Sequence, residues 1–230
     1  MGWKEYYQTS PESFCLKFGR GLLKRILQDQ TEYPLCQKES LRLALGGFSP
    51  RSKTASAFID YCDQLRPNHK DEIYLIDLNC QPFQEVFLPS SLEDSITHKV
   101  QSDLTRQPFG NQSLDLIFLD GTTSFMKDEQ LSQFGQEANR TLTEYGVVIA
   151  LFPDHFSGLL SPISQLYSRV VNRTLIYCRS TKQHQSELTS LKLLWYLDSG
   201  RYTALVLGRQ DNPCPEFSGY PYCLDAIANS

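Results

Sequence analysis

Four short groups of residues could bind a ligand, because each one stands where an apolar segment ends. They are Gly46-Gly47-Phe48-Ser49, Asp77-Leu78, Ser102-Asp103-Leu104 and Asp120-Gly121. Glycine lets the backbone turn tightly and approach a ligand that a β-carbon would repel. The acid of the second group can accept hydrogen bonds from both hydroxyls of a ribose, and that of the third from an adenine amino group. Jointly, the groups predict a site for a nucleotide-like ligand.

These groups depend on an alternation of strands and helices. Near-continuous apolar runs predict strands at 41–45, 73–77, 114–119 and 147–152, with a weaker candidate at 96–100. Apolar residues at helical spacing predict helices at 10–28, 52–65 and 127–142, and a shorter one at 82–88. Such an alternation is typical of parallel strands that are covered on both faces. Ligands bind such sheets at the carboxyl ends of the strands, where the strand order reverses.

The pattern changes after Pro153. Residues 159–171 are predicted to be helical, and the apolar segments 191–197 and 202–207, joined by Asp198-Ser199-Gly200-Arg201, predict a β-hairpin. Tyr145-Gly146 is expected to form a turn before the strand at 147–152. The predicted fold class is α/β, with a doubly wound, mostly parallel sheet, helices on both faces and a C-terminal antiparallel hairpin.

The chain is expected to form one domain over 1–230. Its parts are a helical lead-in that could serve as a lid (1–35), a ligand-binding core (40–154), C-terminal helices with the hairpin (155–210) and an irregular tail (211–230).

The stretch from Leu41 to Asp154 resembles the core of the class I S-adenosylmethionine-dependent methyltransferases, which have a Rossmann-like fold. Gly46-Gly47 matches the glycine-rich first motif, Asp77 the ribose-binding acid and Ser102-Asp103-Leu104 the adenine-contacting motif. The resemblance implies S-adenosylmethionine as the cofactor and methyl transfer to a small molecule as the activity. It implies that the cofactor is bound by Gly46, Gly47, Phe48, Asp77, Leu78, Asp103, Leu104 and Asp120.

The first motif is degenerate. The family usually has an acid two residues before the glycines, where this chain has Ala44, and a third glycine where it has Pro50. An alternative function is therefore that of a catalytically inert Rossmann-like domain that binds a nucleotide-like ligand or a protein partner. The fingerprints G-x-G-x-x-G and G-x-x-x-x-G-K-[ST] are absent, which disfavours nicotinamide enzymes and P-loop hydrolases.

The candidates for catalysis follow the last two strands of the core. His155 and Asp120 could remove a proton from the acceptor, and His184 is a weaker candidate in a polar stretch. Asp120 and Asp154 could hold a magnesium ion, although acids at such positions more often cap neighbouring helices.

Charge and cysteine content restrict the partners. The 230 residues carry a net charge of −4, whereas proteins that bind nucleic acid duplexes are usually basic. Seven scattered cysteines without a C-x-x-C pair support neither a zinc site nor a disulfide framework. No apolar run reaches the ~18 residues of a membrane span. We expect a small-molecule substrate, no nucleic acid or membrane partner, and a cytoplasmic location.

Overall fold

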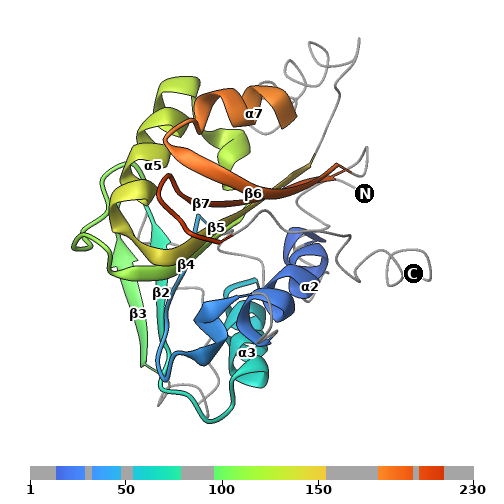
Figure 1. Cartoon of the computed structure of the whole chain (residues 1–230), viewed down its shortest axis with the longest axis vertical. Helices are drawn as coiled ribbons and strands as arrows, with labels where there is room; N and C mark the ends of the chain where they lie inside the picture. Colours follow the sequence, from blue (N-terminus) through green and yellow to red (C-terminus); the bar gives the residue numbers. More distant parts are fainter. Residues whose placement is uncertain are drawn as a thin grey trace.

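A seven-stranded sheet organises the chain, whose structure is a computed structural model that describes residues 14–28, 33–47, 54–78, 96–153, 181–198 and 202–214. The strand order is β3-β2-β1-β4-β5-β7-β6 (Figure 1). The strands are β1 (Arg42–Gly46), β2 (Glu72–Asp77), β3 (Ile96–Gln101), β4 (Leu114–Asp120), β5 (Leu142–Pro153), β6 (Leu191–Asp198) and β7 (Tyr202–Arg209). The first five run parallel, and β7 runs antiparallel to both of its neighbours.

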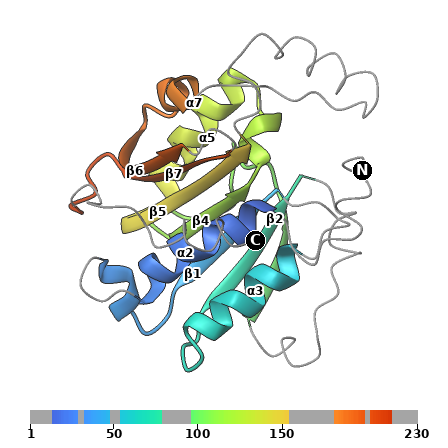
Figure 2. The same cartoon turned by 90° about the vertical axis from the view of Figure 1, so that its right-hand side faces the viewer.

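Helices cover both faces of this sheet. On one face lie α2 (Phe14–Gln28) and α3 (Thr54–Leu65), side by side in Figure 2. On the other lie α5 (Asp128–Thr141) and α7 (Thr181–Glu187). Two short 3-10 helices are η1 (Pro34–Gln37) and η2 (Thr122–Phe125). The predicted doubly wound α/β fold with a C-terminal hairpin is confirmed.

The core forms two apolar layers because successive side chains of a strand point to opposite faces. In β1, Leu43 and Leu45 pack against α2 and α3, whereas Ala44 packs in the layer beneath α5. All three are fully buried, which explains why the strand reads as a continuous apolar run. Helix α2, which belongs to the predicted lead-in, packs into the first layer through Leu23 and Ile26.

The strand order reverses between β1 and β4. The chain leaves β1 towards α3 on one face and leaves β4 towards α5 on the other. We call the edge between the carboxyl ends of β1 and β4 the switch point. It is where open α/β sheets bind their ligands.

The turn predicted at Tyr145-Gly146 is wrong, because both residues lie within β5. Leu114 pairs with Leu142 whereas Leu116 pairs with Val147, so a bulge accommodates the extra residues of β5. Asp115, which is buried, accepts a hydrogen bond of 2.8 Å from the Thr143 hydroxyl at this bulge. We infer that this contact, between residues 28 positions apart, helps to keep Tyr145-Gly146 within the strand, although these residue types favour a turn.

The C-terminal hairpin pairs β7 with both β5 and β6. The first residues of the predicted irregular tail pack closely, since Asn212 and Cys214 are buried. The Lys192 ammonium donates hydrogen bonds of 3.0 Å to the carbonyls of both residues. The helices predicted at 82–88 and 159–171, and residues 10–13 of the first helix, lie outside the described residues. No helix among the described ranges is long and apolar enough to span a membrane.

Candidate functional site

Hydrogen bonds link the carboxyl ends of five neighbouring strands. The amide of Gly47, after β1, donates to the Ile76 carbonyl of β2 at 2.8 Å. The amide of Ser102, after β3, donates to the Asp77 carbonyl at 2.9 Å, and that of Gly121, after β4, to the Leu151 carbonyl of β5 at 2.8 Å. These backbone bonds extend the pairing of β1 with β2, β2 with β3 and β4 with β5 beyond the strands, whereas the pairing of β1 with β4 reaches Gly46 and Leu119.

The side chain of Thr122 joins the two strands at the switch point. Its Oγ1 donates to the Gly46 carbonyl at 2.8 Å and to the Gly47 carbonyl at 2.7 Å. We call these two contacts the Thr122 clasp. The sequence gives little indication of it, because the residues it connects are 75 and 76 positions apart.

The Gly46-Gly47 turn accepts no larger residue. Gly47 has φ +61°, a left-handed conformation that other residues rarely adopt. A β-carbon on Gly47 would lie 2.5 Å from Oγ1 of Thr122, and one on Gly46 would lie 2.8 Å from side-chain carbons of Leu104 and Leu119. The glycines thus bring the ends of β1 and β4 together.

The ends of β2 and β3 place the predicted nucleotide-binding residues along the same edge. Asp77, the last residue of β2, is half-buried, and Leu78 is 62% exposed, a rare exposure for a large apolar side chain among the described residues. Oδ1 of Asp103 accepts a hydrogen bond of 2.9 Å from the Thr105 amide. The Leu104 side chain is buried beneath Gly46, so its backbone is the part that a ligand could contact.

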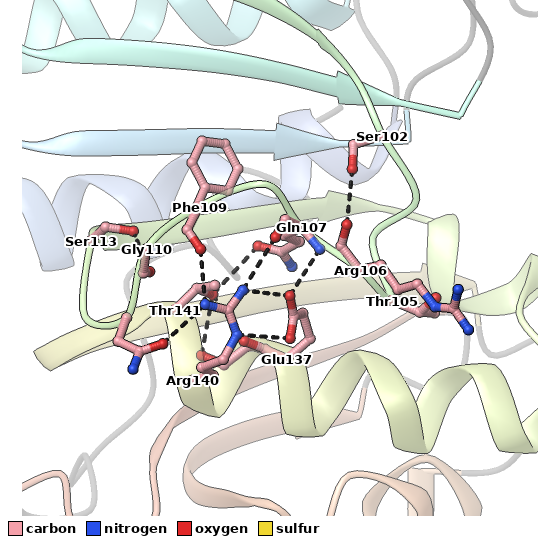
Figure 3. Close-up of polar contacts among 12 residues, drawn as sticks. Ser102, Thr105, Arg106, Gln107, Phe109, Gly110, Ser113, Glu137, Arg140 and Thr141 are labelled. Atoms are coloured by element: carbon pink, nitrogen blue, oxygen red, sulfur yellow. Dashed lines mark hydrogen bonds and ion pairs between the residues drawn. The ribbon is translucent and has the colours of Figure 1, made fainter.

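The loop that carries Asp103 is anchored by a planar ion pair on α5 (Figure 3). The Arg140 guanidinium pairs with both carboxylate oxygens of Glu137, at 2.5 and 3.0 Å. It also donates to the carbonyls of Gln107 and Phe109, at 3.1 and 2.8 Å, and Glu137 accepts the Gln107 amide at 2.9 Å. The loop from β3 to β4 has no helix of its own, so this fork fixes its path.

Phe109 of this loop packs on Tyr74, whose phenol hydroxyl donates to the Glu72 carboxylate. This hydrogen bond, with a smaller contribution from Arg42, lowers the pKa of Glu72. Burial, followed by the bond to Glu72, raises the pKa of Tyr74 to about 12.

Tyr74→Phe is therefore expected to raise the pKa of Glu72 towards its usual value. A lowered carboxyl pKa stabilises the fold above the unfolded pKa of about 4.3, and this contribution is lost as the pH falls through the folded value. The variant should lose this acid-dependent contribution. An NMR titration of the Glu72 carboxyl measures the shift, and Tyr196→Phe, at an exposed phenol on β6, serves as the control. An unchanged Glu72 midpoint in Tyr74→Phe would contradict the assignment.

The residues predicted for catalysis and metal binding are described only in part. Asp120 ends β4 at the switch point and is half-buried, whereas Phe48, Asp154 and His155 lie outside the described residues. Within the described ranges, no group of three or more His, Cys, Asp or Glu side chains could hold a metal ion. His184 is buried on α7 and stacks on Phe152 at 3.7 Å between ring centroids, so it packs in the core.

Ala44 occupies the position where the resembled family usually has an acid. Its side chain is fully buried in the apolar layer beneath α5, with Ile76, Ile117 and Leu119 in the same layer. An ionised carboxylate there would lose its hydration without a partner, so the environment matches the alanine.

Solved structures share this fold at low sequence identity. A protein from Pyrococcus horikoshii OT3 superposes with a TM-score of 0.62 at 12% identity, over 91% of this chain and 100% of its own. A SAM-dependent methyltransferase from Methanosarcina mazei superposes with 0.57 at 10% identity, over 77% of this chain and 98% of its own. The third is geranyl diphosphate C-methyltransferase from Streptomyces coelicolor A3(2), in complex with Mg²⁺, geranyl diphosphate and S-adenosyl-L-homocysteine. It superposes with 0.54 at 10% identity, over 74% of this chain and 72% of its own.

No protein-family model and no curated protein sequence matches the chain. The fold is nevertheless indicated by three observations: the strand order, the antiparallel β7 and the superpositions. The chain has the fold of the class I S-adenosylmethionine-dependent methyltransferases.

Proposed function

We propose that this protein binds S-adenosylmethionine at the switch point and transfers its methyl group to a small-molecule acceptor. The observation that carries the proposal is the Gly46-Gly47 turn, which stands where the strand order reverses and has no room for side chains. The fold supports it, because solved methyltransferases share the strand arrangement.

The residues present suit an adenosyl ligand. A β-carbon on Gly121 would meet no atom within 4 Å, so there is open space beside the end of β4. Leu78 offers an exposed apolar side chain to the face of an adenine ring, and Asp77 offers a carboxylate to the ribose hydroxyls. Asp103 keeps Oδ2 for an amino group, because only its Oδ1 accepts a hydrogen bond from the described residues.

When bound, S-adenosylmethionine supplies a methyl group on a positively charged sulfur, which is a strong electrophile. The protein must then align the acceptor and, for some acceptors, hold the proton that leaves. We propose that Asp120, the last residue of β4, or His155, which follows β5 in the sequence, accepts that proton. A magnesium ion on Asp120 and Asp154 remains the alternative for activating an acceptor hydroxyl.

Calorimetric titration with S-adenosylhomocysteine tests the proposal directly. We expect saturable binding to the wild-type protein, with an increase in its melting temperature. The second candidate function, an inert domain, is favoured by the degenerate first motif with Ala44. If millimolar S-adenosylhomocysteine gives neither heat nor a thermal shift, the proposed function is wrong, and the inert domain is the function that the fold supports.

Asp77→Ala is expected to weaken binding of S-adenosylhomocysteine by about 1.5–3 kcal/mol, because hydrogen bonds to a charged acceptor are lost. The free energy of unfolding should change little, since Asp77 lies at the carboxyl end of β2 and not in the apolar layers. Isothermal titration and urea unfolding measure the two quantities. Asp63→Ala removes an exposed acid on α3 and is the matched control. Equal affinities for Asp77→Ala and wild type would show that Asp77 is structural.

A further inference from the structure

We propose that the Thr122 hydroxyl is a positioning residue, which fixes the Gly46-Gly47 turn and thereby sets the affinity of the switch point for its ligand. The inference deepens the proposed function and rests on it for the ligand. Thr122 is not among the residues that the resemblance to the methyltransferases assigns to cofactor binding.

The pairing of β1 with β4 ends at Gly46 and Leu119, and the turns beyond these residues need a further contact to hold them together. The chain leaves β1 and β4 towards opposite faces, so the two turns diverge and their amides bond to outer neighbours. Gly47 donates to β2 and Gly121 donates to β5, both at 2.8 Å. The Thr122 clasp joins the turns after β1 and β4.

The geometry of the clasp fits a positioning role. One hydroxyl proton is shared between two carbonyl oxygens, at 2.8 and 2.7 Å, so both peptide planes of the turn are oriented by one atom. The Thr122 methyl group fills the space beside the Gly47 α-carbon. The turn is thus held by the amide of Gly47 on one side and by Thr122 on the other.

The clasp also has a fixed base. Gly121, which precedes Thr122, has φ +70° and donates its amide to Leu151 of β5, while its carbonyl accepts the Ser124 amide at 3.1 Å. These bonds start the 3-10 helix η2 that carries Thr122. A displacement of the glycine turn must therefore break the clasp rather than move Thr122 with it.

The test compares Thr122→Val with Thr122→Ser. Valine keeps the shape and removes both hydrogen bonds, whereas serine keeps the hydroxyl. We expect Thr122→Val to weaken S-adenosylhomocysteine binding about tenfold and Thr122→Ser to stay within about twofold of wild type. Ser113→Ala is the matched control, because it removes a hydroxyl-to-carbonyl bond of 2.7 Å before β4, at the opposite edge of the sheet.

Amide hydrogen exchange by NMR provides a readout that does not need the ligand. The Gly47 amide should exchange about tenfold faster in Thr122→Val, while the Ser102 amide, bonded to Asp77 on the same edge, should keep its rate. Faster exchange with weaker binding supports the proposal. Faster exchange with unchanged affinity overturns the ligand part, and unchanged exchange overturns the clasp itself. If the wild-type protein binds no S-adenosylhomocysteine, the proposed function fails and takes the ligand part with it, while exchange still decides on the clasp.

Discussion

Replacing Arg66 by alanine is expected to lower the free energy of unfolding by about 3–5 kcal/mol, because it leaves the Asp71 carboxylate, which is only 10% exposed, without its cation. Arg66 is 3% exposed, and its guanidinium donates to Asp71 through Nε at 2.7 Å. It also donates to the carbonyls of Cys36 and Lys38, at 3.2 and 2.7 Å. Asp71 in turn accepts the Leu41 amide at 2.8 Å, just before β1. One side chain thus connects the segments that precede β1 and β2.

Urea unfolding followed by circular dichroism measures this loss. The matched control is Arg42→Ala, since the Arg42 side chain is 51% exposed and its ion pair with Glu72, at 3.2 Å, faces water. Exposed pairs contribute at most about 1 kcal/mol, so this control should stay near wild type. Similar small losses for Arg66→Ala and Arg42→Ala would contradict the assignment of Arg66 as a buried structural cation.

Gly47→Ala should have the largest effect at the switch point. The left-handed conformation costs an alanine about 1–2 kcal/mol, and forcing a methyl group against Thr122 adds about 1–3 kcal/mol. We expect a loss of about 2–5 kcal/mol of stability, together with loss of S-adenosylhomocysteine binding, because the turn must shift to relieve the clash. Thermal unfolding and calorimetric titration of the same samples measure both effects.

Gly121→Ala separates the two contributions. Gly121 has φ +70°, but a β-carbon there meets nothing within 4 Å, so only the conformational cost of about 1–2 kcal/mol applies. The double variant Gly47→Ala/Thr122→Ala removes the clashing methyl and hydroxyl, and should recover part of the stability that Gly47→Ala loses. Equal destabilisation by Gly47→Ala and Gly121→Ala would falsify the steric part of the prediction.

The sheet could be predicted because its strands are buried on both faces. Residues 114–119 are apolar except for Asp115, and they form β4 with Asp120 added. Even the weak candidate at 96–100 forms β3. Local composition favours a turn at Tyr145-Gly146, but the bulge opposite Asp115 depends on pairing with β4, which a local pattern does not contain.

The sequence predicts which residues of the site lie at strand ends, but it predicts fewer of the contacts between their side chains. Gly46, Asp77, Asp103 and Asp120 all lie at the carboxyl edge, because parallel strands bring their ends to one side. No local pattern marks Thr122, because its contact with Gly46 spans 76 positions of the sequence. The sequence does not indicate the burial of His184, because its helix has 7 residues, too few for a periodic apolar pattern, and its stacking partner belongs to β5.

The insertion of β7 between β5 and β6 affects how the protein can be synthesised. Residues 202–208 of β7 pair with residues 147–153 of β5. The inner strand β7 therefore leaves the ribosome after β6, the outer strand that pairs with it. Until β7 emerges, β5 presents an unpaired edge, and β6 has no strand in the native order to join. A nascent chain that stops short of residue 202 therefore exposes a strand edge that can pair with other chains or bind chaperones, and the sheet is completed only after residues 202–208 have been translated.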